Sequence, residues 1–361
     1  MAPPLPAAAM LASTLLQRSS DGQIVSEVAQ GRHESQKDWD LIRDIDSGVP
    51  SPPENSIFSC GRVVGISGLY TANERGEGND GSDIQVWVGE LSLHVLVYTL
   101  TGRLPLESTF PRAFVVQFLD SRPISRESLF QSIQQRLPSK SAADVEDLIS
   151  KIQIYQTFEF DDILEAVARI SDTLYNIQQQ INQAASSAQG RHEPTLVILE
   201  GIDRSLEEII RASNPLAAQA RLLPLLRTLT ILSRTYSSFV TVIVVNALPL
   251  PATIPGSVQQ GRDYRPSQRQ ESSSTQDRNH LQQPQSHPLI PVQSIFARAP
   301  APRPPGSSAF SRSAMSYATI LARTLDQGFD IHLLVSKVQN RMVIEVAKDR
   351  LGDNLGRWCA L

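Results

Sequence analysis

Two carboxylates close the segment PTLVILEGIDRS at residues 194–205. Four apolar residues run from Leu196 to Leu199, and Glu200 and Asp203 follow them. An apolar run of this kind is typical of a buried parallel strand, which delivers its last residue to the edge of a sheet. An acid at that edge can hold a metal ion for nucleotide chemistry. It can equally lie near the positive amino end of the next helix and stabilise that helix, so both explanations stay open.

Cysteine and histidine chemistry finds little support in the sequence. Cys60 and Cys359 are the two cysteines of the 361-residue chain, which excludes a disulfide framework and a cysteine-based zinc site. They favour a reducing, intracellular compartment. His94 and His332 each lie in an apolar stretch, and we expect packed or half-exposed side chains rather than ligands. The net charge of −4 provides no global positive field for nucleic acid, so any such contact has to be local.

The elements that must position the two carboxylates alternate between strands and helices. Apolar, β-branched runs predict strands, and apolar residues three and four apart predict helices. The predicted strands are residues 61–68, 113–120, 151–158, 194–200 and 239–247, and the predicted helices are 88–100, 125–137, 160–188, 216–236 and 314–326. Ser125 is expected to cap the second helix. Continuous apolar strands predict an α/β fold with a mostly parallel sheet covered by helices on both faces.

Three further segments complete the organisation. Residues 1–55 are polar with a proline-rich end and are predicted to be a flexible leader, ahead of a core over residues 56–361. Residues 255–312 are predicted to be a disordered insert rich in Pro, Gln, Ser and Arg, because they lack the apolar surface that offsets the entropy of ordering. Residues 330–350 predict a C-terminal β-hairpin around Gln339-Asn340. No apolar run reaches the roughly 20 residues that a membrane span needs.

This order of elements, together with three motifs, resembles the RecA-like recombinase family in its eukaryotic recombinase-paralogue branch. The resemblance covers about residues 58–361. TLVILEGID looks like the second nucleotide motif of the family, FVTVIVVNA like its strand ending in Asn-Gln, and HLLVSKVQNRMVIEVAKDRLG like its closing hairpin. The resemblance implies a RecA-like P-loop NTPase core. It also implies a role in homologous recombination and a nuclear location.

The phosphate-binding loop of that family has the form GxxxxGK[ST], in which the lysine neutralises phosphate and the hydroxyl helps to hold Mg²⁺. Gly65 and Gly68 stand where this loop should begin. Gly89-Glu90-Leu91 stands where Gly-Lys-Thr would precede the helix. A carboxylate at Glu90 repels a triphosphate instead of neutralising it.

The other residues of the family's ATP site are also absent or altered in this sequence. The chain has no lysine in residues 38–139, and the planar fork of Arg75 does not replace a compact ammonium. Arg122 falls where the family has its catalytic Glu, and Asn246-Ala247 stands where it has Asn-Gln, whose Gln senses the γ-phosphate. Glu200 fills the place of the metal-linked Asp, so the acid is present without its partners.

The insert follows the fifth strand, where the family has a DNA-binding loop. Its arginines can contact phosphate in a salt-dependent way, and its tyrosine can stack on a base. The candidates for these contacts are Arg262, Tyr264, Arg265 and Arg269. The alternative is a solvated insertion with no binding role. Phe296 to Ala299 read FARA, which matches the FxxA pattern by which recombinase partners dock, although about one such match is expected by chance.

We therefore predict a recombinase-like fold without ATP hydrolysis, and we expect neither ATP-Mg²⁺ nor another metal as cofactor. The expected function is a non-catalytic recombinase paralogue in homologous recombination DNA repair. It would pair with another paralogue or a recombinase and assist recombinase assembly on single-stranded DNA. One alternative is a divergent DNA-stimulated ATPase that uses Arg75 and Glu200, and the other is an α/β binding protein unrelated to DNA. No membrane association is expected.

Overall fold

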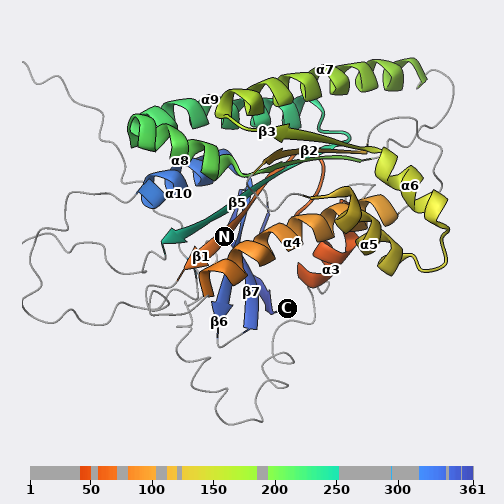
Figure 1. Cartoon of the computed structure of the whole chain (residues 1–361), viewed down its shortest axis with the longest axis horizontal. Coiled ribbons are helices and arrows are strands. Elements are labelled where there is room, and N and C mark those ends of the chain that lie inside the picture. The colour runs from red at the N-terminus through yellow and green to blue at the C-terminus, as the bar shows by residue number, and fades with distance from the viewer. Residues whose placement is uncertain are drawn as a thin grey trace, which may run out of the picture.

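The computed structural model describes residues 41–49, 56–70, 80–102, 112–119, 124–184, 194–251, 294, 317–338, 341–350 and 352–360. Element labels are those of Figure 1. The helices are α3 (Leu41–Ser47), α4 (Asp80–Thr101), α5 (Arg126–Arg136), α6 (Ala142–Ser150), α7 (Phe160–Ala184), α8 (Ile202–Ala212), α9 (Pro215–Thr235) and α10 (Tyr317–Gly328). The strands are β1 (Val63–Tyr70), β2 (Ala113–Phe118), β3 (Ile152–Thr157), β4 (Thr195–Glu200), β5 (Val240–Pro251), β6 (Ile331–Val338), β7 (Arg341–Asp349) and β8 (Trp358–Ala360).

These strands form one sheet in the order β3-β2-β4-β5-β1-β6-β7-β8. Each pair from β3 to β6 is parallel, whereas β7 and β8 pair antiparallel at the far end. The prediction of an α/β fold with a mostly parallel sheet is confirmed, and so is the closing hairpin of β6 and β7. Trp358 and Cys359 lie in β8, the last strand of the sheet.

Helices cover both faces of the sheet, as Figure 1 shows. Core residues of α3, α4, α5 and α6 pack on one face, and those of α7, α8, α9 and α10 pack on the other. Every residue of β2 and of β4 is buried. Continuous apolar strands require cover on both sides, because each face would otherwise expose its alternate side chains to water.

Local signals explain where several helices begin. Ser125 accepts a hydrogen bond from the Ser128 amide and caps α5 as predicted. Ser141 forms a similar capping box with Asp144 and starts α6, which the sequence analysis did not identify. Asn214 caps α9, and Pro215 follows it at a first-turn position that proline favours. The helix predicted over residues 216–236 corresponds to α9, and α8 precedes it as a separate helix.

The predicted leader differs from the structure over residues 41–49. These residues contain the short helix α3, whose Leu41 and Ile45 are buried against the core and which contacts α4. The Asp44 carboxylate accepts a hydrogen bond from the Ile57 amide at 2.9 Å. Leu41 and Ile45 are the buried apolar pair at helical spacing in α3, and one such pair within a polar sequence is too weak a pattern to predict a helix. Residues 41–49 therefore belong to the core rather than to a flexible leader.

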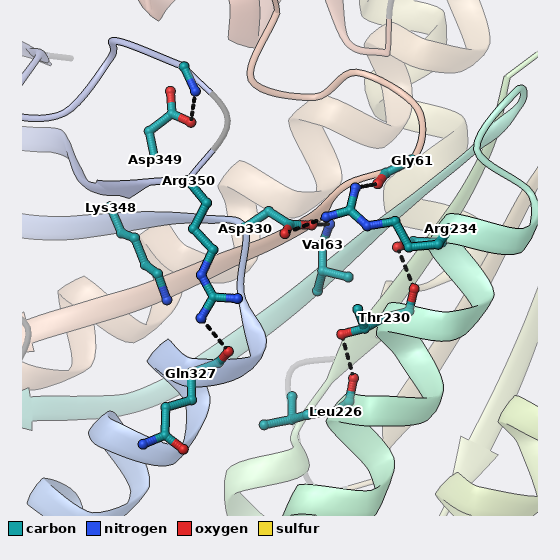
Figure 2. Close-up of polar contacts among 12 residues, drawn as sticks. Gly61, Val63, Leu226, Thr230, Arg234, Gln327, Asp330, Lys348, Asp349 and Arg350 are labelled. Carbon is teal, nitrogen blue, oxygen red and sulfur yellow. Dashed lines mark hydrogen bonds and ion pairs between the residues drawn. The ribbon is translucent and has the colours of Figure 1, made fainter. Parts of the chain in front are cut away.

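A polar clamp joins the amino ends of β1 and β6 to α9 (Figure 2). Asp330, just before β6, accepts a hydrogen bond from the Val63 amide at 2.9 Å and forms an ion pair with Arg234 at 2.7 Å. Arg234, in the last turn of α9, also donates to the Gly61 carbonyl. We call Asp330, Arg234, Val63 and Gly61 the amino-edge clamp. It connects segments that are far apart in the sequence.

None of the helices in the described ranges combines the length and the apolar character needed to cross a membrane.

Candidate functional site at the carboxyl edge of the sheet

Polar side chains gather toward the carboxyl ends of four parallel strands. The parallel register places Ser67 of β1 beside Asn246 of β5, and Gln117 of β2 beside Glu200 of β4. All four are buried. In open α/β sheets, ligands bind outside the carboxyl ends of strands, at points where neighbouring connections leave to opposite faces. β2 continues into α5 on one face and β4 into α8 on the other, so Glu200 lies at such a point.

Glu200 is enclosed between two helices. Its side chain lies on the α4 side, where Ser92 donates a hydrogen bond to Oε1. The residue is only 5% exposed. Burial raises the pKa of Glu200 to about 7, the hydrogen bond from Ser92 opposes that rise, and the buried Asp203 in the first turn of α8 adds to it. Glu200 therefore holds a proton far more readily than an ordinary carboxyl does.

No positive charge acts on Glu200 in the part of the chain that the structure describes. The influences on its pKa are burial, a neutral hydroxyl and a second acid. The same residues contain no group of three His, Cys, Asp or Glu side chains that could hold a metal ion. A triphosphate with Mg²⁺ needs cationic partners, whereas Mg²⁺ bound to phosphates needs only one or two protein oxygen ligands. The described neighbours of Glu200 supply no cation, and Ser92 donates a hydrogen bond to Glu200 instead.

Gly65 and Gly68 lie inside β1 rather than at the start of a loop. A Cβ at Gly65 would stand 2.0 Å from the ring of Phe329, and a Cβ at Gly68 would stand 2.8 Å from Ile84 of α4. Both glycines therefore make room for apolar side chains, one on each face of the strand. Sequence spacing could not distinguish a packing glycine from a phosphate-binding glycine, because both need the missing side chain.

Gly89 and Glu90 lie well inside α4, which begins at Asp80. The alignment of Gly89-Glu90-Leu91 with the end of a phosphate loop is therefore wrong, since such a loop ends at the first turn of its helix. Glu90 is exposed, and a Cβ at Gly89 would meet nothing within 4 Å. The side chain of α4 that donates a hydrogen bond to Glu200 is Ser92, which no sequence motif had marked.

A second hydrogen-bonded chain was also missed. His332 of β6, which is fully buried, contacts the Ser67 hydroxyl through Nε2 at 2.9 Å and Asp326 of α10 through Nδ1 at 3.2 Å. Acid, histidine and serine occur in this order in hydrolases, but the Ser67 hydroxyl is buried and has no access to a substrate. Burial alone would raise the pKa of Asp326. Its contacts with His332 and Lys348 outweigh burial and hold that pKa below its ordinary value. These hydrogen bonds between Asp326, His332 and Ser67 anchor α10 to the sheet.

His94 is half-exposed, which is one of the two arrangements expected for it. It lies on the surface of α4, 3.1 Å from the carboxylate of Asp46, and stacks on Tyr98. Its side chain is 43% exposed. His332 is packed, which is the other expected arrangement.

Several predicted residues lie outside the described residues. They include the nucleotide candidate Arg75, Arg122 at the place of the family's catalytic Glu, the DNA candidates Arg262, Tyr264, Arg265 and Arg269, and the partner motif from Phe296 to Ala299. Ser294 is a described residue within the predicted insert, and it is buried. The other predicted site residues, Glu200 and Asn246, lie at one sheet edge, because Glu200 pairs with Val245, the residue before Asn246.

No protein-family model matches the chain, and no curated protein matches it at a significant level.

Proposed function

We propose that the chain is a RecA-like core that has lost its nucleotide chemistry and acts as a non-catalytic adaptor in homologous recombination DNA repair. It would pair with another recombinase paralogue or a recombinase in the nucleus and assist recombinase assembly on single-stranded DNA. The proposal rests on the sequence resemblance, together with the parallel α/β sheet that such a core requires.

The observation that carries the loss of nucleotide chemistry is the environment of Glu200. The acid stands at the end of the strand where the family has a metal-linked Asp, yet it is buried against Ser92 and has a raised pKa. An acid that serves Mg²⁺ must be ionised and open to the ion. The absence of lysine from residues 38–139 points the same way, because positioned positive charge supplies most of the catalysis of phosphoryl transfer.

Binding of radiolabelled ATP with Mg²⁺ tests this proposal. We expect no saturable binding and no turnover in the wild type or in the Glu200→Gln variant, which removes the charge and keeps the shape. Micromolar binding with turnover that Arg75→Ala abolishes would instead establish the divergent ATPase.

Titration with single-stranded DNA at several salt concentrations tests the other alternative. We expect affinity that falls as salt rises, alone or with a partner, because phosphate contacts release counterions. Replacing Arg262, Arg265 and Arg269 together with alanine should flatten that dependence. If no salt-dependent affinity is found in any of these mixtures, the chain is better described as an α/β protein unrelated to DNA.

Purification of the tagged full chain from its native cell identifies the partner directly. Recovery of a recombinase or of a second paralogue is the expected result. Recovery of neither, in the presence of intact recombinase, contradicts the adaptor role.

A further inference from the structure

The sheet has two edges of different character. β8 is three residues long, whereas β3 at the opposite edge has six residues, IQIYQT, with no charge and no proline. Proteins usually protect an exposed edge strand with charge, proline or short length, because its free backbone groups invite another strand. Exposed apolar side chains lie at this edge: Ile154 is 37% exposed and Phe158, directly after β3, is 59% exposed. Within the residues that the structure describes, the β3 edge therefore has neither the charge, the proline nor the short length that usually protects such a strand.

The backbone of β3 shows which groups face outward. The carbonyls of Lys151 and Thr157 accept hydrogen bonds from β2 and the residue after it. In a parallel ladder, alternate residues direct both backbone groups to one neighbour. The odd-numbered residues of β3 therefore face β2, and Ile152, Ile154 and Gln156 direct their amides and carbonyls away from the sheet. These three alternate residues, whose backbone groups face outward, can pair with one further strand.

We propose that β3 pairs antiparallel with β3 of a second copy of this chain, across a two-fold axis at Ile154. Outward-facing residues then stand opposite each other in hydrogen-bonded pairs. Ile154 meets Ile154 of the other copy, and Ile152 meets Gln156. The two sheets join into one continuous sheet. A two-fold interface is self-complementary, and this strand meets that requirement because no charge is brought against its like.

The helix beside this edge adds charge complementarity. α7 contacts β3, and although burial dominates and raises the pKa of Tyr155 in that strand, the charge of Arg169 on α7 acts in the opposite direction. Glu165 lies one turn earlier and forms an exposed ion pair with Arg169. Two copies of α7 that run antiparallel across the axis bring Glu165 of each near Arg169 of the other. A helix that carries both charges one turn apart is complementary to an antiparallel copy of itself, and less so to a partner surface that carries charge of a single sign.

Sedimentation equilibrium of the full chain tests the proposal. We expect a dimer that Ile154→Lys weakens by about tenfold or more, since like charges directly opposite in a sheet are destabilising. Ile231→Lys is the matched control, because Ile231 is 66% exposed on α9, which packs on the strands β1 and β5 away from this edge. A wild type that stays monomeric at concentrations of tens of micromolar, or a dimer that both variants weaken equally, overturns the proposal.

Cysteine substitution tests the register and does not depend on the folding of a lysine variant. Hydrogen-bonded opposite residues have Cα atoms about 5.5 Å apart, which a disulfide can span. Ile154→Cys should therefore give a covalent dimer on mild oxidation. Gln156→Cys should not, because the two copies of residue 156 lie four residues apart, about 13 Å along the strand. Equal cross-linking of both variants, or of wild type with Cys60 and Cys359 alone, contradicts the register.

The dimer is independent of the adaptor role. A monomer by sedimentation leaves the ATP and DNA tests unaffected, and a dimer that binds ATP overturns the adaptor role alone.

Discussion

Glu200 and Asp330 are both buried carboxyls at the ends of strands, with exposed fractions of 5% and 4%. Asp330, at the amino edge, receives the guanidinium of Arg234 and the amide of Val63 (Figure 2). Glu200, at the carboxyl edge, receives a neutral hydroxyl, and burial raises its pKa to about 7. A buried charge is tolerated when a countercharge accompanies it. The paired carboxylate of Asp330 therefore stabilises the amino edge, whereas the ionised form of Glu200 at the carboxyl edge destabilises the folded state.

The largest effect is expected from breaking the amino-edge clamp. Asp330→Ala leaves the Val63 amide and Arg234 without their acceptor, and we expect the free energy of unfolding to fall by about 3 kcal/mol. Urea unfolding at neutral pH measures this loss. Glu207→Ala breaks the exposed ion pair with Arg211 and should cost no more than about 0.5 kcal/mol. Similar losses for both variants would remove the distinction between the clamp and an ordinary surface pair.

The pH dependence of Glu200 has the opposite sign. Because its folded pKa of about 7 lies above the ordinary value of 4.5, the folded state binds more protons between these values, and the free energy of unfolding falls as pH rises through them. The loss is at most about 3 kcal/mol and is complete above pH 7. Glu200→Gln should match the wild type near pH 4.5 and exceed it at pH 8. Parallel stability curves from pH 4.5 to 8 would contradict this account.

Two glycines give a matched comparison of packing. Gly65→Ala places a Cβ against Phe329, and we expect a loss of about 1–3 kcal/mol from overpacking. Gly89→Ala meets nothing in α4 and should gain about 0.5–1 kcal/mol through helix propensity. Thermal unfolding compares them, and Phe329→Leu should partly restore the Gly65 variant. If Gly65→Ala is neutral, the glycine does not serve the packing of β1.

The smallest effect concerns the hydroxyl that faces Glu200. Ser92→Ala removes the single donor to that carboxyl in the described part of the chain. We expect it to cost about 1 kcal/mol more at pH 8 than at pH 5, because only the ionised carboxyl depends on a donor. Urea unfolding at the two pH values measures the difference. In the Glu200→Gln background the difference should vanish, and its persistence would point to a role of Ser92 apart from Glu200.

Much of the architecture could be predicted from the chain itself. The strands β2, β4 and β5 are buried on both faces. Such a strand must be apolar at nearly every position, and this made the three unbroken apolar runs recognisable. The amphipathic stripe of α7 was equally clear, since Ile163, Val167, Ile170 and Leu174 recur at helical spacing and are all buried. α3 and α6 were missed, because short helices contain too few repeats to stand out from polar surroundings.

The candidate site was only partly predictable. The acid at the end of β4 was found, because a strand that ends in a carboxylate is a local signal. Its partner Ser92 was not, since 108 residues separate the two side chains and no pattern relates them. The role of Gly65 was likewise decided by Phe329, which the chain brings back to β1 from far along the sequence.

By itself, the sequence determined the central strands and the longer helices, where an acid ends a strand, and that no lysine lies within residues 38–139. The tertiary structure alone decided that α4 extends across the carboxyl edge, that Glu200 is buried beside Ser92, and that β3 forms an uncharged edge. The reason is physical: local patterns record which residues avoid water, whereas pKa, packing space and edge exposure depend on neighbours that only the folded chain brings together.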